Sequence, residues 1–271
     1  MKKMMLIIVA ILICNLTGVS NARLDKNYGV FIGMKPKNVM KLRGYKKLVL
    51  DGEYFSAKQI KKLHDRGNKH IYSYLNIGFI ENFRDYYKDF ENITLGDYED
   101  WPEEKWIDVS KKSWQKFITE KGRELKKKGI EGFFIDNTDV YYIYPKNKIY
   151  EGLLNILKTL RNELKIPLII NGGNVFVEKV LKEDFGKNFI QGINQETVFT
   201  AIDFKNKTLK KRTDSDKIYY QRYIRKCKKA GVKVFLLEYT KSRNLSNVIK
   251  KYCKKHGYFY YISKSVELDR E

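Results

Sequence analysis

Histidine and cysteine are scarce in this chain: 271 residues include only three of each. His64 falls in a predicted helix, His70 at the start of a predicted strand and His256 at the end of a predicted helix. None therefore follows the end of a strand, where α/β enzymes place catalytic groups. This excludes a serine–histidine or cysteine–histidine mechanism, and no histidine-containing set of metal ligands is recognisable. A carboxylate-ligated metal stays open, but we expect neither metal nor cofactor.

Long apolar runs are absent except at the N-terminus. There, Lys2 and Lys3 precede an apolar stretch over residues 4–14, and Ser20-Asn21-Ala22 fits a signal-peptidase site. We therefore expect residues 1–22 to be a signal peptide cleaved after Ala22, with an uncleaved N-terminal anchor as the alternative. Residues 23–271 would then form one secreted or cell-envelope-associated domain. No later segment is long and apolar enough to cross a membrane.

Two cysteines remain after that cleavage, Cys227 and Cys253, in neighbouring predicted helices near the C-terminus. An oxidising compartment would permit a disulfide between them, but lysines and aliphatic residues surround both, so two unpaired thiols stay open as well. The sequence does not reveal the oligomeric state directly, and we expect a monomer.

Acidic residues are outnumbered, and the net charge is +22. Cleavage removes Lys2 and Lys3 and no acid, which leaves +20. Such a charge would suit nucleic acid or an anionic cell surface. However, the lysines fall mostly in predicted helices, as solvated faces do, and no nucleic-acid motif accompanies them. We expect no nucleic-acid partner, and electrostatic association with anionic envelope polymers stays open.

Residues 80–108 depart from this basic character. They hold ten acids against Arg84, Lys88 and Lys105, a local charge of −7. This segment also lies in the longest interval between two predicted strands. Long connections in compact domains are usually functional.

Eight short β-branched or aromatic runs alternate with helical patterns along the chain. The predicted strands are residues 28–32, 48–51, 70–76, 132–136, 168–171, 191–195, 234–238 and 258–262. Helices are predicted over roughly 35–43, 56–66, 113–128, 150–164, 175–183, 216–230 and 243–255. This alternation predicts an α/β fold, a single (β/α)8 barrel. A doubly wound open sheet is the alternative, but Gly33-Met34-Lys35-Pro36 after the first strand is no phosphate-binding loop.

Acids, amides and two tyrosines lie at or just after the C-terminal ends of the predicted strands, which in a barrel form the catalytic face. These residues are Asp51, Tyr74, Asn76, Asp136, Asn137, Asp139, Asn171, Glu196, Glu238 and Tyr239. Paired carboxylates without histidine are what glycoside hydrolysis requires, one as an acid and one as a nucleophile or base. We take Asp136 and Glu196 as the catalytic pair. For Asp51 and Glu238, a structural ion pair is as plausible as contact with substrate.

Aromatic side chains near these positions could stack on sugar rings. The candidates are Tyr74, Tyr98, Trp101, Trp106 and Tyr141. Packing in the core is the alternative for each of them.

These motifs, in this order, resemble glycoside hydrolase family 114, the endo-α-1,4-polygalactosaminidase family. The resemblance covers nearly all of residues 23–271 and rests on residues 74–78 with Glu81 and Arg84, then on residues 129–139, 169–173, 194–199 and 257–263 with Leu268-Asp269. The family usually has Gly-Phe-Asp-Gly where this chain has Gly129-Ile130-Glu131-Gly132. The resemblance implies a barrel hydrolase with Asp136 as nucleophile and Glu196 as acid/base. It also implies endo-acting cleavage of α-1,4-linked galactosamine polymers, with Glu81 and Arg84 among the substrate-binding residues.

A polymer of unacetylated galactosamine is cationic, and a protein of +20 should repel it unless the groove is locally acidic. The acidic segment 80–108 meets that requirement independently of the family. An alternative function of a different class is a non-catalytic barrel of the envelope that binds polysaccharide.

Overall fold

Eight parallel strands form the centre of the protein in the computed structural model, which describes residues 26–98, 103–183, 189–204, 206 and 208–271. They are β1 (Gly29–Val30), β2 (Lys47–Leu50), β3 (His70–Asn76), β7 (Gly132–Asp136), β8 (Leu168–Asn171), β9 (Gly192–Glu196), β12 (Lys233–Tyr239) and β13 (Phe259–Ser263). Each strand is hydrogen-bonded to the next in this order. All eight predicted strands are thus present, within a few residues of the expected bounds.

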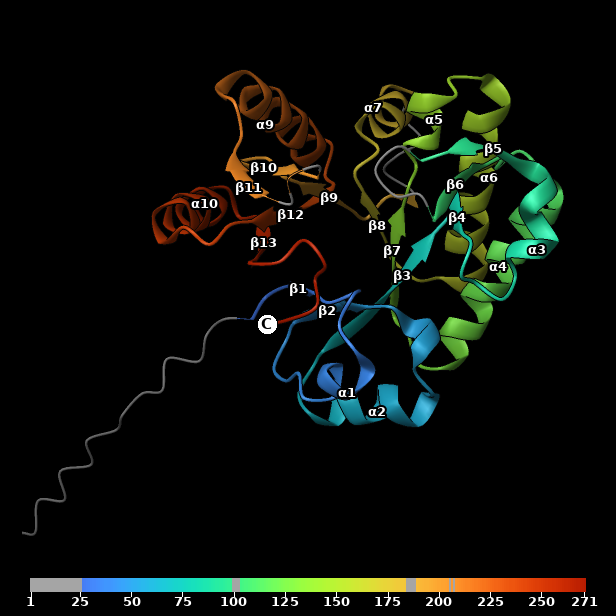
Figure 1. The fold of residues 1–271 in the computed structure, drawn as a ribbon, viewed down its shortest axis with the longest axis horizontal. Helices are drawn as coiled ribbons and strands as arrows, with labels where there is room; N and C mark the ends of the chain where they lie inside the picture. Colours follow the sequence, from blue (N-terminus) through green and yellow to red (C-terminus); the bar gives the residue numbers. More distant parts are fainter. Residues whose placement is uncertain (1–25, 99–102, 184–188, 205, 207) are drawn as a thin grey trace, which may run out of the picture.

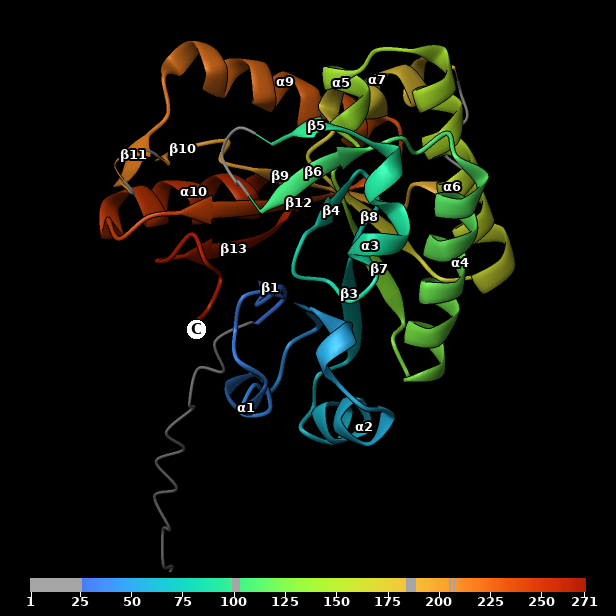
Figure 2. The same cartoon turned by 45° about the vertical axis from the view of Figure 1, so that its right-hand side comes forward.

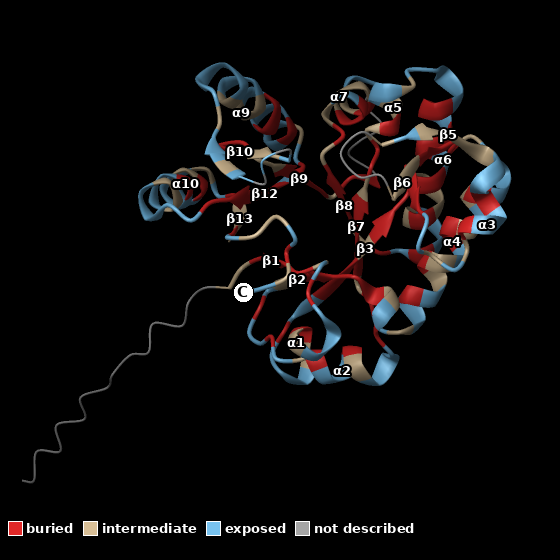
Figure 3. Ribbon diagram, viewed as in Figure 1, coloured by how far each residue is buried: buried red, intermediate tan, exposed pale blue. Residues whose placement is uncertain are grey.

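Helices follow the strands and lie outside the ring (Figure 1). They are α1 (Pro36–Val39), α2 (Ala57–Asp65), α4 (Lys112–Lys127), α6 (Asn147–Leu164), α7 (Asn174–Lys182), α9 (Asp214–Lys229) and α10 (Arg243–His256). In α6, Leu153, Leu157 and Leu160 recur at helical spacing and are fully buried. The outer faces carry the exposed residues, as Figure 3 shows. The lysine-rich helical faces are therefore solvated surface, as expected.

The strands close into a nearly complete barrel, which confirms the predicted fold. β1 and β13 are the two ends of the hydrogen-bonded order, and the Phe31 and Tyr261 rings meet beside them at 5.1 Å between centroids. Alternate residues point into the barrel or toward the helices. Val49, Phe134, Ile169 and Leu237 are among the residues of the inner core.

Two additions extend the barrel beyond the sequence prediction (Figure 2). Between β3 and α4, an antiparallel sheet of β4 (Phe79–Glu81), β6 (Glu104–Ile107) and β5 (Thr94–Asp97) forms, with the short helix α3 (Tyr87–Phe90). After β9 comes the hairpin of β10 (Thr200–Asp203) and β11 (Thr208–Lys211). The sequence predicted a long functional connection at the first place but no strands at either. Both additions follow the C-terminal ends of barrel strands, so they rim the catalytic face.

Cys227 and Cys253 are both buried and both free thiols. The expected signal peptide lies outside the described residues. Within the described residues, no helix combines the length and apolar character needed to cross a membrane.

Candidate active site

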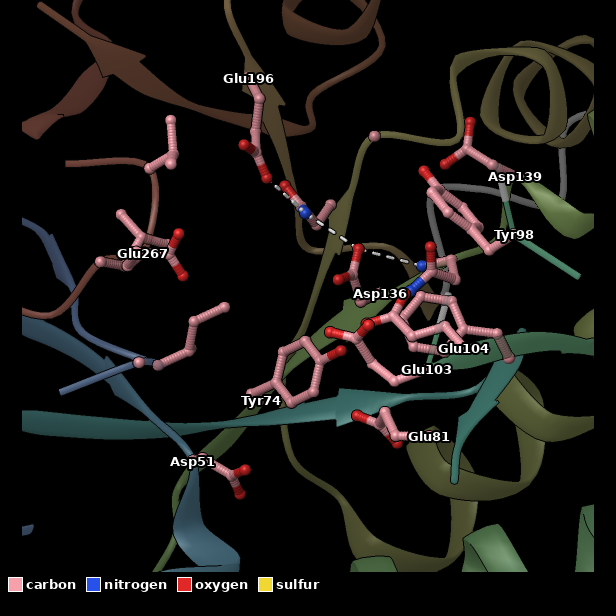
Figure 4. A pocket seen from close by; sticks show the side chains of 18 of the residues that line it. Asp51, Tyr74, Glu81, Tyr98, Glu103, Glu104, Asp136, Asp139, Glu196 and Glu267 are labelled. Carbon is pink, nitrogen blue, oxygen red and sulfur yellow. Dashed lines mark hydrogen bonds between the residues drawn. The ribbon is translucent and has the colours of Figure 1, made fainter. Parts of the chain in front are cut away.

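Asp136 and Glu196 end β7 and β9, and the strand between them ends on Asn171. The Asn171 side-chain Nδ2 donates to Asp136 Oδ1 at 2.9 Å and to Glu196 Oε1 at 2.8 Å (Figure 4). Even in a straight line, hydrogen bonds of 2.9 and 2.8 Å would place these two carboxylate oxygens no more than about 5.7 Å apart. The structure therefore brings the two predicted catalytic acids together around one amide.

A chain of hydrogen bonds fixes the orientation of that amide. The Tyr28 hydroxyl donates to Asn194 Oδ1 at 3.0 Å, and Asn194 Nδ2 donates to Asn171 Oδ1 at 2.7 Å. Because its oxygen is occupied, Asn171 must present its NH2 group to the two acids. The sequence analysis did not select Tyr28 or Asn194 as site residues. The available signal was strand periodicity, since Asn194 lies two residues before Glu196 and so faces the same side.

The backbone turns sharply directly after each acid. Asn137 and Thr197, the next residues, have φ values of +65° and +55°, in the left-handed region that most side chains avoid. Such strain persists where the surrounding structure enforces it, often at functional sites. Here the turn after each acid ends the strand and directs the backbone away from the acid.

Burial raises the pKa of both catalytic carboxyls. It raises the pKa of Asp136 to about 7, with a further increase from the nearby Glu196 charge and a decrease from the Asn171 hydrogen bond. Burial also raises the pKa of Glu196, against the hydrogen bonds from Tyr239 and Asn171. The Tyr239 hydroxyl donates to Glu196 Oε2 at 2.6 Å. The pair can therefore hold one shared proton near neutral pH.

Three further carboxyls of the site, those of Glu104, Asp139 and Asp51, have raised pKa values. Burial raises the pKa of Glu104 to about 8, and the charges of Glu81 and Asp136 add to this. One Glu104 oxygen, Oε2, is buried without a hydrogen-bond partner among the described residues. Burial raises the pKa of Asp139 to about 6, although Asp139 Oδ2 accepts a hydrogen bond from the Gly173 amide at 2.9 Å. Glu104 belongs to the acidic segment but was not among the predicted site residues.

A cleft of about 520 Å³ opens over the catalytic pair. Among its described lining residues, Arg84 is the one base, and the acids are Asp51, Glu81, Glu103, Glu104, Asp136, Asp139, Glu196 and Glu267. Figure 4 shows Glu81, Glu103 and Glu104 on one side and Glu267 across from them. The cleft is thus strongly acidic within a strongly basic protein. Glu99 and Asp100 of the acidic segment lie outside the described residues.

Most of the predicted substrate-binding residues line this cleft. They are Asp51, Tyr74, Glu81, Arg84, Asn137, Asp139, Asn171 and Tyr239. The alternation of side chains explains the agreement, because Asp51, Tyr74, Asp136, Asn171 and Glu196 each lie two residues beyond an inward-facing residue of the same strand.

Glu238 and Asn76 do not line the cleft, so the structure does not support direct contact with substrate for either. The carboxylate of Glu238 is fully buried and accepts hydrogen bonds from the Phe199 and Thr200 amides and the Thr200 hydroxyl. Asn76 Oδ1 accepts from the Gly78 and Phe79 amides. Both side chains hold the backbone that forms the cleft wall.

The aromatic candidates divide in the same way. Tyr74 and Tyr98 line the cleft. Trp106 and Tyr141 are not part of its lining and pack against other aromatic rings. Trp101 lies outside the described residues. Among the residues that the sequence analysis missed are Tyr54, Phe83, Ile202, Phe204 and Glu267.

Comparisons with known proteins agree with the barrel fold. The barrel is similar to the glycoside hydrolase domain of PelA from Pseudomonas aeruginosa, with a TM-score of 0.77 and 15% identity over 90% of this chain and 96% of that one. It is also similar to Ega3 from Aspergillus fumigatus, solved in complex with galactosamine, with a TM-score of 0.64 and 15% identity over 83% of this chain and 85% of that one. A search of curated proteins found none that matches. The model of glycoside-hydrolase family GH114 matches residues 44–270, most of the chain, and the protein therefore belongs to that family.

Proposed function

We propose that this glycoside hydrolase is endo-acting and cleaves internal bonds of α-1,4-linked galactosamine polymers. We propose that it acts outside the cell or at the cell envelope. The observation that carries the proposal is the pair Asp136 and Glu196, bridged by Asn171 at the floor of an acidic cleft. The similarity to Ega3, whose structure contains galactosamine, supports the choice of sugar.

The separation of the two acids supports a retaining mechanism. Retaining enzymes place the carboxyl groups about 5–5.5 Å apart, whereas inverting enzymes leave about 6.5–9.5 Å for a water molecule. The bridge through Asn171 agrees with the shorter spacing. By family resemblance, Asp136 attacks the anomeric carbon while Glu196 protonates the departing oxygen. Glu196 then removes a proton from the water that releases the sugar from Asp136.

For these roles, the proton that Asp136 and Glu196 share must lie on Glu196. Glu196 accepts hydrogen bonds from Tyr239 and Asn171, which favour its ionised form, but an acid must carry the proton. A cationic sugar next to Asp136 favours the ionised form of Asp136. The shared proton of the pair then passes to Glu196, where catalysis needs it.

The charge of the cleft supports an amino-sugar substrate. Among the described residues, eight acids and one arginine line it, so it attracts a polycation that the rest of the protein repels. A fully N-acetylated polymer lacks this charge. We therefore expect unacetylated or partly acetylated galactosamine to be preferred.

The proposal can be tested by digestion of a long α-1,4-galactosamine oligomer, with products sized by mass spectrometry. Wild type should release fragments of intermediate length, as endo-action requires, and Asp136→Asn should lose at least about a thousandfold in kcat. Exposed Asp65→Asn is the matched control and should remain active. If wild type binds the oligomer without cutting it, the protein is a polysaccharide-binding barrel instead.

Azide rescue tests the two roles. Azide should restore turnover of an activated substrate by Glu196→Ala without inverting the product, because the nucleophile is intact. In Asp136→Ala it should give the inverted glycosyl azide. The opposite pattern would reverse the assignment.

A further inference from the structure

We propose that Tyr54 and Phe83 form a sugar-stacking subsite at one end of the cleft, which binds a ring of the polymer away from the bond that is cut. This inference rests on the proposed function. Both side chains line the cleft, yet 55% of Tyr54 and 58% of Phe83 is exposed. Open aromatic faces beside a glycan cleft suit the apolar face of a pyranose ring.

Arg84 holds the two rings in place. Its guanidinium carbon lies 5.8 Å from the centre of the Tyr54 ring and 5.4 Å from that of Phe83. Arg84 is itself fixed, because it donates to Asp51 Oδ2 and Glu81 Oε1, each at 3.1 Å. The rings therefore rest on a buried, hydrogen-bonded support, which lowers the entropic cost of stacking a sugar on them.

The position of the rings places the subsite away from the catalytic pair. Tyr54 follows β2 and Phe83 follows β4, next to β3, whereas Ile202 and Phe204 line the cleft after β9. In this ring of eight strands, β2 and β3 are second and third and lie opposite β9 and β12, which are sixth and seventh. Phe204 is also 39% exposed. Aromatic rings thus lie on both sides of the catalytic pair, as a groove for a continuous polymer requires.

The chemistry around Arg84 favours a cationic sugar over a neutral one. Arg84 contacts three carboxylates, those of Asp51, Glu53 and Glu81, and Lys121 also pairs with Glu53. Three acids thus meet two bases, so the support of the rings is not basic overall. An ammonium group on the stacked sugar meets this negative potential and the negative faces of the rings. The ligand class is therefore a pyranose bearing a free amino group.

Binding at such a subsite should depend on substrate length. Contacts with remote parts of a substrate lower the barrier only for substrates long enough to reach them. The experiment compares kcat/KM for a long α-1,4-galactosamine oligomer and for the trisaccharide, using Tyr54→Ala, Phe83→Ala and the double variant. Each single variant should lose about five- to tenfold on the long oligomer and less than about twofold on the trisaccharide.

Two kinds of control accompany these variants. Tyr54→Phe and Phe83→Tyr keep the rings and should recover most of the loss that the alanine variants show on the long oligomer. Tyr142→Ala removes a ring that is 64% exposed and lies outside the cleft lining, so it should change neither value. These controls separate stacking from general loss of aromatic surface.

Equal losses on the two substrates would overturn the subsite, because the rings would then only support Arg84 and the cleft wall. Unchanged activity on the long oligomer would overturn it as well. Failure of wild type to cut any galactosamine oligomer would instead refute the proposed function. The ratio of kcat/KM between variant and wild type thus tests the subsite. The activity of wild type alone tests the proposed substrate.

Discussion

The cleft and the outer surface of α10 carry opposite charges in the same molecule. In the part of the chain that the structure describes, eight acids and one arginine line the cleft, whereas Lys250, Lys251, Lys254 and Lys255 are exposed along α10. Salt screens charges beyond about 8–10 Å, so a ligand in the cleft experiences mainly the local acids. The net charge of the protein therefore indicates what its outer surface attracts. The local charge of the cleft indicates the charge of the substrate.

After substitution of the catalytic acids themselves, the largest expected effect comes from the Asn171 amide, which bridges the acids of the cleft. Asn171→Ala should lower kcat by about a hundredfold, because Asp136 and Glu196 both lose a donor that positions them. Steady-state kinetics on the galactosamine oligomer measure it, with exposed Asn244→Ala as the control. Asn171→Asp should be worse still, since it adds a third carboxyl. A loss below about threefold in Asn171→Ala would show that the bridge does not contribute to catalysis.

The sequence predicted the barrel because local signals and global fold agree. Apolar β-branched strands alternate with amphipathic helices, and the order of parallel strands places Asp136, Asn171 and Glu196 next to one another at one end. The β4–β6–β5 sheet was missed because Glu104-Lys105-Trp106-Ile107 has a mixed charged and apolar pattern. Its strands form only where the barrel supports them.

Glu238 shows why the candidate site was predicted only in part. It follows inward-facing Leu237 directly, so the two-residue period of a strand turns it toward the helices, while Tyr239 faces the cleft. The alternation is visible in the sequence, but Glu238 was predicted to face the cleft together with its neighbour Tyr239. Tyr54 and Phe83 had no such signal, because Tyr54 ends a short 3-10 helix, Gly52–Tyr54, and Phe83 lies in a turn, and the direction of both segments depends on packing.

The second prediction concerns stability, since buried acids in the cleft and behind its wall have raised pKa values. Burial raises the pKa of Asp136 and of Glu238 to about 7, and that of Asp139 to about 6. The folded protein therefore binds these protons more tightly than the unfolded chain, whose acids ionise near pH 4. Stability is greatest below that pH for these groups and is lost as pH rises through about 7.

Thermal unfolding of the substrate-free protein tests this sign. Tm should fall by several degrees between pH 5 and pH 8, and Asp136→Asn should flatten part of the slope. The lysines of α10 stay charged throughout and should contribute little. A Tm that rises over this range would mean that the buried acids are ionised in the folded state.

A smaller effect is expected from Glu104, whose pKa is raised to about 8 by burial and by the charges of Glu81 and Asp136. An ammonium group bound beside Glu104 favours its ionised form, so binding below pH 8 should release a proton. Glu104→Gln should raise KM about fivefold with little change in kcat, and less for an N-acetylated substrate. Calorimetry of oligomer binding to Asp136→Asn, in buffers of different ionisation enthalpy, counts the protons. Proton release that survives in the Asp136→Asn/Glu104→Gln double variant would assign it to another acid.

The smallest effect on catalysis should come from the basic surface itself. Replacing Lys250, Lys251, Lys254 and Lys255 with Gln removes four exposed charges from α10 but should leave kcat/KM within about twofold, because salt screens them from the cleft. The same variant should elute from an anionic polysaccharide matrix at lower salt, since each lost lysine removes one contact with the polymer. Glu103→Gln, in the cleft, is the matched comparison and should raise KM without changing elution. If the lysine variant instead cuts the cationic oligomer much faster at low salt, the outer charge does repel the substrate, and the cleft and the surface are not electrostatically separate.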